Sequence, residues 1–78
     1  MQTKPFFIRV EWDEEAQVWV ATSDDVPGLA TEEETIEVLI TKLKSLIPEL
    51  LEANKVHYKD EIPFEMLTRR FEVIPVSA

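Results

Sequence analysis

The chain has 78 residues, no cysteine and a formal net charge of −8, which comes from 16 acidic and eight basic residues. This length predicts a single domain, residues 1–78, with one small core, and the lack of cysteine excludes disulfides and thiolate metal sites as supplements to that core. The acidic balance argues against binding to nucleic-acid phosphates. It suits a basic partner, and the alternative is an acidic surface that only keeps a small protein in solution.

Two further classes of protein are disfavoured by the apolar pattern. No apolar run approaches the roughly 20 residues of a membrane helix, and residues 1–5 lack the hydrophobic region of a signal peptide. We therefore expect a cytoplasmic protein that does not interact with membranes. Because the core is small and has no covalent staple, we also expect self-association, most simply as a homodimer.

The N-terminal part predicts an antiparallel hairpin. Residues 6–12 alternate between apolar and polar faces, residues 13–16 have no hydrophobic pattern, and residues 17–23 are rich in strand-forming types. If Trp12 lies opposite Gln17, then Val10 faces Trp19, and a slip of one residue exchanges the two faces. The sequence leaves this register open.

The second predicted strand is apolar on both faces. Val18 and Val20 lie on one face, and Trp19 lies on the other. In either register, one of these two sets faces away from a helix that covers the sheet. We therefore interpret Val18, Trp19 and Val20 as a possible interface with a second copy or with another protein.

A turn follows this strand. Pro27 fixes its own φ near −65°, and Gly28, the only glycine, accepts a positive φ without steric cost, so residues 26–29 are typical of a type II turn. Asp25 is the residue type that stabilises such a turn through its side chain. We predict that Asp25, Pro27 and Gly28 have structural roles.

A long helix is indicated next by apolar residues spaced by three and four. These residues are Ile36, Leu39, Ile40, Leu43, Ile47, Leu50 and Leu51. Thr31 and Thr35 are competing start signals, and residues 53–55 are a plausible end at which Asn54 takes the left-handed conformation. Pro48 predicts a kink or a break into two helices.

The last predicted strand covers residues 67–76, after a polar loop at residues 56–61 and an extended stretch at residues 62–64. Pro75 suits the edge or the end of a strand. The element order is therefore β-β-α-β. This order predicts an α+β fold, in which one long kinked helix covers an antiparallel three-stranded sheet.

The inventory of chemical groups does not favour an enzyme. The acidic clusters at residues 13–15, 24–25 and 32–34 have no EF-hand spacing, and a solvated loop, a turn and a helix start explain them with fewer assumptions. His57 is the single histidine, and it lies in a predicted loop. We expect no catalytic residues, no cofactor and no metal ion. We also expect the one basic concentration, Arg69 and Arg70 with Lys55 and Lys59, to balance glutamates of the helix.

The order of strand, turn, threonine and helix resembles a known family. The residues that carry the resemblance are Trp12-Asp13, Val18-Trp19, the run Ala21-Thr22-Ser23-Asp24-Asp25-Val26-Pro27-Gly28-Leu29, and Ile47-Pro48-Glu49-Leu50-Leu51. They are similar to the N-terminal domain of HicB-like antitoxins, within a small branch that carries the label of a domain of unknown function. The resemblance covers roughly residues 6–76, and it favours Thr35 as the helix start.

This resemblance implies a truncated RNase H-like or double-stranded-RNA-binding-like fold. It also implies a protein that binds and neutralises a small basic RNA-cleaving toxin of the HicA type. Antitoxins of this family often carry a further C-terminal DNA-binding segment, and because the sequence ends at Ala78 we expect no direct nucleic-acid binding. The alternative is an orphan dimerisation or regulatory module that has no toxin partner.

Overall fold

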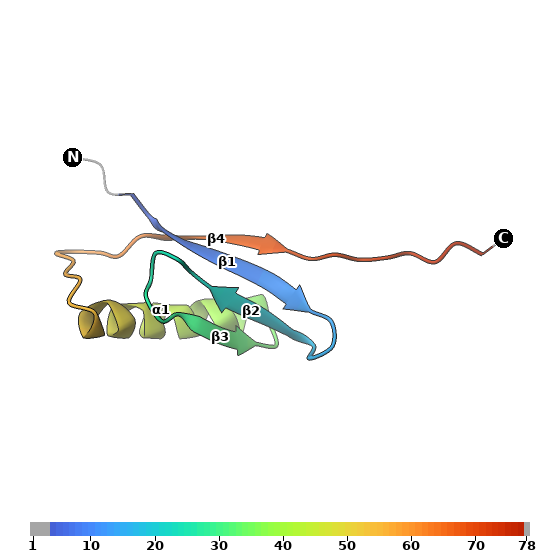
Figure 1. Ribbon diagram of the computed structural model, residues 1–78, viewed down its shortest axis with the longest axis horizontal. Coiled ribbons are helices and arrows are strands. Elements are labelled where there is room, and N and C mark those ends of the chain that lie inside the picture. The colour runs from blue at the N-terminus through green and yellow to red at the C-terminus, as the bar shows by residue number, and fades with distance from the viewer. Residues whose placement is uncertain (1–3, 78) are drawn as a thin grey trace.

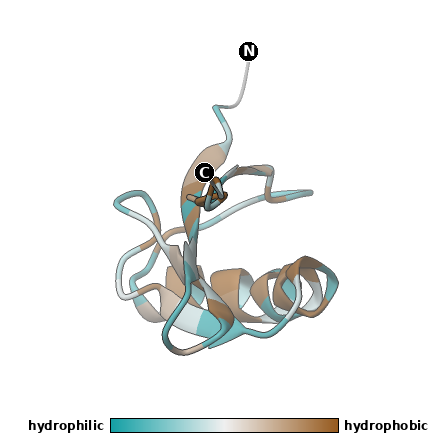
Figure 2. Ribbon diagram, turned by 90° about the vertical axis from the view of Figure 1, so that its right-hand side faces the viewer, coloured by the Kyte–Doolittle hydropathy of each residue, from teal (hydrophilic) through white to brown (hydrophobic). Residues whose placement is uncertain are grey.

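The computed structural model describes residues 4–77, so residues 1–3 and 78 of the predicted single domain lie outside the described residues. The elements in chain order are β1 (Phe6–Asp13), β2 (Val18–Thr22), β3 (Ala30–Glu33), α1 (Ile36–Ala53) and β4 (Phe64–Arg69). The strands form one sheet in the order β3-β2-β1-β4, and α1 packs on one face of it (Figures 1 and 2). The α+β class is therefore confirmed, whereas the predicted three-stranded antiparallel sheet is wrong.

The additional strand is β3, which pairs antiparallel with β2. Its sequence Ala-Thr-Glu-Glu has no apolar alternation, because it lies at the edge of the sheet and none of its residues is fully buried. Glu33 on its inner side forms an ion pair with Lys42 of α1, at 3.0 Å between Nζ and Oε2. Pairing with β2 and with the helix thus defines this strand, and local propensity does not.

The extra strand also explains why β4 runs parallel to β1. Each hairpin or helix connection reverses the direction of the chain, so one additional strand before α1 reverses the direction of everything after it. The predicted order β-β-α-β would have made the last strand antiparallel to the first. The sheet is therefore mixed, and β3, α1 and β4 form a crossover connection between parallel strands.

The hairpin register differs from the one considered from the sequence. Trp12 lies opposite Trp19, and Val10 lies opposite Ala21. The shift arises because Gln17 belongs to the turn, where it has a φ of 58° and its N–H donates to the Asp13 carbonyl at 2.8 Å. A shift of two residues keeps the predicted faces, so Val18 and Val20 still lie opposite to the helix side.

The last strand is shorter and starts earlier than predicted. β4 ends at Arg69, which pairs with Glu11 near the end of β1. Residues 70–77 leave the body of the molecule as an extended segment (Figure 1). Residues 67–76 therefore alternate as a strand does, but residues 70–76 have no neighbouring strand within this molecule to pair with.

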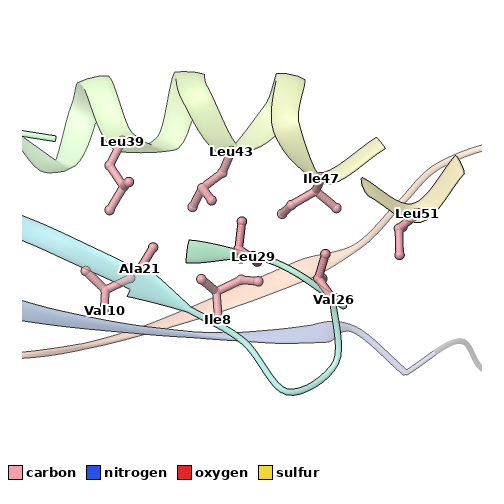
Figure 3. Packing of buried hydrophobic residues seen from close by; sticks show 9 residues of the cluster. All are labelled: Ile8, Val10, Ala21, Val26, Leu29, Leu39, Leu43, Ile47 and Leu51. Carbon is pink, nitrogen blue, oxygen red and sulfur yellow. The ribbon is translucent and has the colours of Figure 1, made fainter. Parts of the chain in front are cut away.

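The core forms between α1 and the inner face of the sheet. The buried apolar residues are Ile8, Val10, Ala21, Val26, Leu29, Leu39, Leu43, Ile47 and Leu51. Figure 3 shows the four helix residues pointing at the strands and at the turn after β2. This arrangement is what the three-and-four spacing predicts, because such a stripe lies on one side of a helix.

Both ends of α1 are capped. Thr35 is the N-cap, and its Oγ1 accepts a hydrogen bond from the Val38 N–H at 3.1 Å, whereas Thr31 lies within β3. At the other end, Lys55 has the left-handed φ of 60°, whereas Asn54 has a φ of −101°. The prediction that Asn54 takes the left-handed conformation is therefore wrong by one residue. The bonds from Lys55 N to Glu52 O and from Val56 N to Leu51 O form a Schellman motif.

The helix continues through Pro48 as a single element. Of the two alternatives, a kink or a break, the break into two helices is therefore excluded, and the kink stays a prediction. Pro48 is exposed, and Leu51 one turn later is buried in the core. Burial of the stripe on both sides of the proline thus outweighs the missing backbone hydrogen bond to the Lys44 carbonyl.

Candidate functional site

The loop after β2 is tied to β1 by two side chains. Ser23 Oγ donates to the Phe7 carbonyl at 2.6 Å, and the Phe7 N–H donates to Asp25 Oδ2 at 2.8 Å. These side chains replace the backbone partners that β2, which ends at Thr22, no longer supplies. The Asp25 side chain therefore bonds to the sheet, whereas the N–H groups of Asp25 and Val26 donate to Ser23 Oγ at 3.0 and 3.1 Å. Ser23 was not singled out from the sequence. A serine just before a turn is a known signal for bonds to the backbone two or three residues later, and not for the bond to Phe7.

The turn itself has type II geometry. The Leu29 N–H donates to the Val26 carbonyl at 3.1 Å, and Gly28 has a φ of 83°. Because Val26 and Leu29 are both buried, the turn places two core residues beneath α1. Pro27 and Gly28 are themselves exposed, and their structural role is to form the bend between these two buried residues.

An aromatic pair lies on the helix side of the sheet, close to the β1–β2 hairpin. The rings of Trp12 and Trp19 meet edge to face, with centroids 5.1 Å apart. The Arg70 guanidinium lies over the Trp12 ring at 4.2 Å from its centroid, and it also pairs with Glu72. The prediction that Arg70 balances glutamates of the helix is therefore wrong, because Arg70 follows β4 directly beside Trp12.

The three predicted interface residues do not form one surface. Trp19 faces the helix side and packs against the core, whereas Val18 and Val20 lie on the open face of the sheet. All three are half-buried. Val20 lies between Glu11 of β1 and Glu32 of β3, so its apolar side chain has acidic neighbours on both adjoining strands.

An acidic hollow lies next to Val20. It has a volume of about 510 Å³, and it is lined by Glu11, Trp12, Asp13, Glu14, Glu15 and Val20. Asp13 accepts the backbone N–H groups of Glu15 and Ala16, and Glu14 accepts the Trp12 indole N–H at 3.1 Å. Within residues 4–77 the ion pairs are Lys42–Glu33 and Arg70–Glu72, so neither Glu11 nor Glu15 belongs to an ion pair there, although Arg69 of β4 lies beside Glu11 in the strand register.

A second concavity separates α1 from β4. It has a volume of about 220 Å³, and its lining includes Leu43 and Ile47 of the helix, Ile62 and Phe64. It exists because α1 covers the β3 side of the sheet, whereas β4 lies at the opposite edge. The helix-side residues of β4, Phe64 and Met66, are consequently only half-buried.

The segment after β4 exposes large apolar side chains. Phe71 is 72% exposed, Val73 70%, Ile74 85% and Val76 89%. Leu67 of β4, on the open face, is 64% exposed. Soluble monomers rarely present so many contiguous apolar residues to water, so this segment is a second candidate interaction surface.

Residue types that bind metal ions do not cluster in the part of the chain that the structure describes. Among residues 4–77, no group of three or more His, Cys, Asp or Glu side chains is arranged to hold a metal ion. His57 is exposed in the loop after α1, next to Tyr58. No helix in the described part of the chain has the length and apolar character that crossing a membrane requires.

Comparison with known proteins identifies the family. Residues 5–76 match the domain of unknown function DUF1902. The chain belongs to this family. The crystal structure of a hypothetical protein from the extremely thermophilic bacterium Thermus thermophilus matches it with 45% sequence identity and a TM-score of 0.71, and the match covers 94% of this chain and 100% of the other. No curated protein matches this DUF1902 chain.

Proposed function

We propose that this protein is a non-enzymatic, cytoplasmic, antitoxin-like binding protein that neutralises a small basic RNA-cleaving toxin of the HicA type. The proposal rests on the resemblance to HicB-like antitoxins and on one structural observation, the acidic hollow beside Val20. The finer assignment of the fold as HicB-like, in a truncated RNase H-like form, belongs to the same proposal.

The hollow suits a basic partner for physical reasons. A protein that cleaves RNA needs a basic surface to hold phosphates, and the carboxylates of Glu11 and Glu15 are complementary to that surface. Val20 adds an apolar contact that a solvated acidic patch alone would lack. A toxin that engages this hollow presents its cationic groups to the antitoxin, and it is therefore prevented from presenting them to RNA.

The alternative is an orphan dimerisation or regulatory module without a toxin partner. The observation that favours it is the exposed apolar segment after β4, which needs no basic partner. Gene context separates the two candidates. A short basic open reading frame beside the gene supports the antitoxin, and its absence supports the orphan module.

Binding to the product of that neighbouring reading frame provides the direct test. We expect the two proteins to co-purify, and we expect this chain to suppress RNA cleavage by the neighbour while degrading no RNA itself, with or without Mg²⁺. Glu11→Lys and Glu15→Lys should each weaken binding, and the weakening should shrink at high salt. Glu61→Lys, at an exposed loop position away from the hollow, is the matched control and should bind as the wild type does.

Val20 gives a second test of the same surface, at its apolar contact. Val20→Lys should abolish binding while the protein remains folded, because the side chain lies on the open face and not in the core. Unchanged binding by all three variants, or RNA cleavage that purifies with this chain, would contradict the proposal.

A further inference from the structure

We propose that two copies of this chain pair antiparallel through the outer edge of β4 and the segment that follows it. Residues 70–77, named here the C-terminal segment, would lie along β4 of the other copy, with Ile74 opposite the partner's Met66. The two sheets would join into one sheet of eight strands. This inference goes beyond the proposed function, because it requires no toxin.

The first support is the path of the C-terminal segment. Arg70, the first residue after β4, still lies over the Trp12 ring of β1. Figure 1 shows the segment running away from the body of the molecule. Its apolar side chains therefore have no cover from their own copy, and Ile74 and Val76 are more than four-fifths exposed.

The second support is the direction of the backbone groups of β4. The Phe6 N–H donates to the Pro63 carbonyl, which fixes the odd-numbered residues of β4 as those that bond to β1. The N–H and C=O groups of Phe64, Met66 and Thr68 consequently point to the outer edge, where the sheet ends. This edge is available for strand addition.

Pro75 is compatible with this pairing. Proline lacks an N–H group, so it is tolerated in a strand only where no ladder bond is needed. If the alternation of β4 continues through the C-terminal segment, the nitrogen of Pro75 points to the same side as that of Glu65, away from the outer edge. The proline therefore removes no hydrogen bond from a ladder between two copies.

The hydrogen bonds restrict the register, and the apolar residues select it. In an antiparallel ladder, a residue whose N–H and C=O groups point to the outer edge lies opposite a residue of the same kind in the other copy, so even-numbered residues pair with even-numbered residues. Because residues that lie opposite each other project their side chains to the same face, both helices lie on the same face of the joined sheet. With Met66 opposite Ile74, Phe64 lies opposite Val76, and Leu67 lies opposite Val73 on the open face. The exposed aliphatic residues of the C-terminal segment, Val73, Ile74 and Val76, thus each lie opposite an apolar residue of β4 in the other copy.

Charge favours the β4 edge over the other edge of the sheet. Residues 64–77 contain two arginines and two glutamates, so their net charge is zero. The register places Arg70 opposite Arg70 of the other copy, and the Glu72 carboxylate that pairs with each guanidinium within its own copy offsets that positive charge. The opposite edge strand, β3, carries Glu32 and Glu33 and is followed by Glu34. Pairing of two copies through β3 would place these carboxylates close together in a chain that is already acidic.

Sedimentation equilibrium of the full chain tests the pairing. We expect the wild type to be a dimer at micromolar concentrations. Ile74→Lys should raise the dissociation constant by roughly ten-fold or more, because it places a charge at the apolar contact. The fold should persist in this variant, since the side chain is exposed within its own copy. Val38→Lys, at a half-exposed apolar position on α1, is the matched control and should remain dimeric.

Two results would overturn the proposal. One is a wild-type monomer at high micromolar concentration. The other is a dimer that Ile74→Lys does not weaken, which would place the contact on another surface or assign the C-terminal segment to a different protein.

Engineered cysteines test the register, and the chain has no native cysteine to interfere. The variant with Leu67→Cys and Val73→Cys should form covalent dimers fastest in oxidising buffer. Two control variants combine Val73→Cys with either Glu65→Cys or Arg69→Cys. Each would crosslink fastest only if the register between the two copies were shifted by two residues, in one direction or the other. Within one extended strand even the nearest of these pairs is separated by about 13 Å, which is beyond the reach of a disulfide. Faster crosslinking of either control pair would overturn the register.

Discussion

Replacing Gly28 isolates the cost of a left-handed backbone at a single turn. Gly28 has a φ of 83°, and a Cβ added there would lie 3.7 Å from Leu50 Cδ2, which is an ordinary van der Waals contact. Space for a methyl group is therefore present. The loss of stability in Gly28→Ala must come from the backbone conformation that the type II turn imposes, and not from a clash with α1.

The magnitude follows from two opposing effects. A left-handed conformation costs an L-residue about 1–2 kcal/mol. Alanine also reduces the conformational entropy of the unfolded chain, which offsets about 0.4–1 kcal/mol. We therefore expect Gly28→Ala to lower the free energy of unfolding by about 1 kcal/mol, and Gly28→Val to lower it further, because β-branching adds strain at a positive φ. In a domain of this size, 1 kcal/mol corresponds to about 4–8 °C in Tm.

Urea and thermal denaturation followed by circular dichroism measure both variants. A double-mutant cycle with Leu50→Ala separates backbone strain at position 28 from the contact between the new side chain and Leu50. If backbone strain alone is responsible, Gly28→Ala lowers the free energy of unfolding by the same amount with Leu50 present or replaced. If Gly28→Ala and Gly28→Val leave the unfolding midpoint unchanged, the strained type II turn is refuted. If the cost disappears in the Leu50→Ala background, the contact with α1 is responsible and the reasoning about φ is wrong.

Substitutions at three further positions test the helix, each by urea denaturation. Lys55→Gly should raise the free energy of unfolding by up to about 1 kcal/mol, because Lys55 holds a φ of 60° in the Schellman motif; a loss of stability would contradict that assignment. Thr35→Ala should lower it by about 1 kcal/mol by removing the acceptor for the Val38 N–H, whereas Thr35→Ser should retain most of it; equal effects of the two would exclude the cap. Pro48→Ala should raise it by about 2 kcal/mol by restoring the donor to the Lys44 carbonyl, and a decrease would show that the proline ring contributes packing at the groove between α1 and β4.

Local physical chemistry determined the elements that the sequence alone predicts well. The β1–β2 hairpin follows from alternation, the turn at Gly28 follows from the conformational preferences of proline and glycine, and the buried stripe of α1 follows from its spacing. The resemblance to HicB-like antitoxins placed the helix start at Thr35, between two local signals of similar strength. In each case the signal lies within a few residues of the feature.

The candidate surfaces were only partly accessible from the sequence. Val18 and Val20 were separated from Trp19 by alternation alone, because a strand places successive side chains on opposite faces. Other contacts join residues that are distant along the chain. Arg70 lies over the Trp12 ring, and the side chains of Ser23 and Asp25 form hydrogen bonds with the Phe7 backbone. Neither contact has a local pattern that predicts it.

Tertiary structure alone decided the remaining features. β3 has no apolar alternation and exists because β2 offers hydrogen-bonding partners, and its presence reverses the direction of β4 relative to β1. The pattern at residues 67–76 predicts a strand correctly as far as Arg69, which is the last residue that pairs with β1. Alternation reports which side chains suit a sheet, whereas pairing requires a neighbour in space, and the position of that neighbour is set by the path of the whole chain.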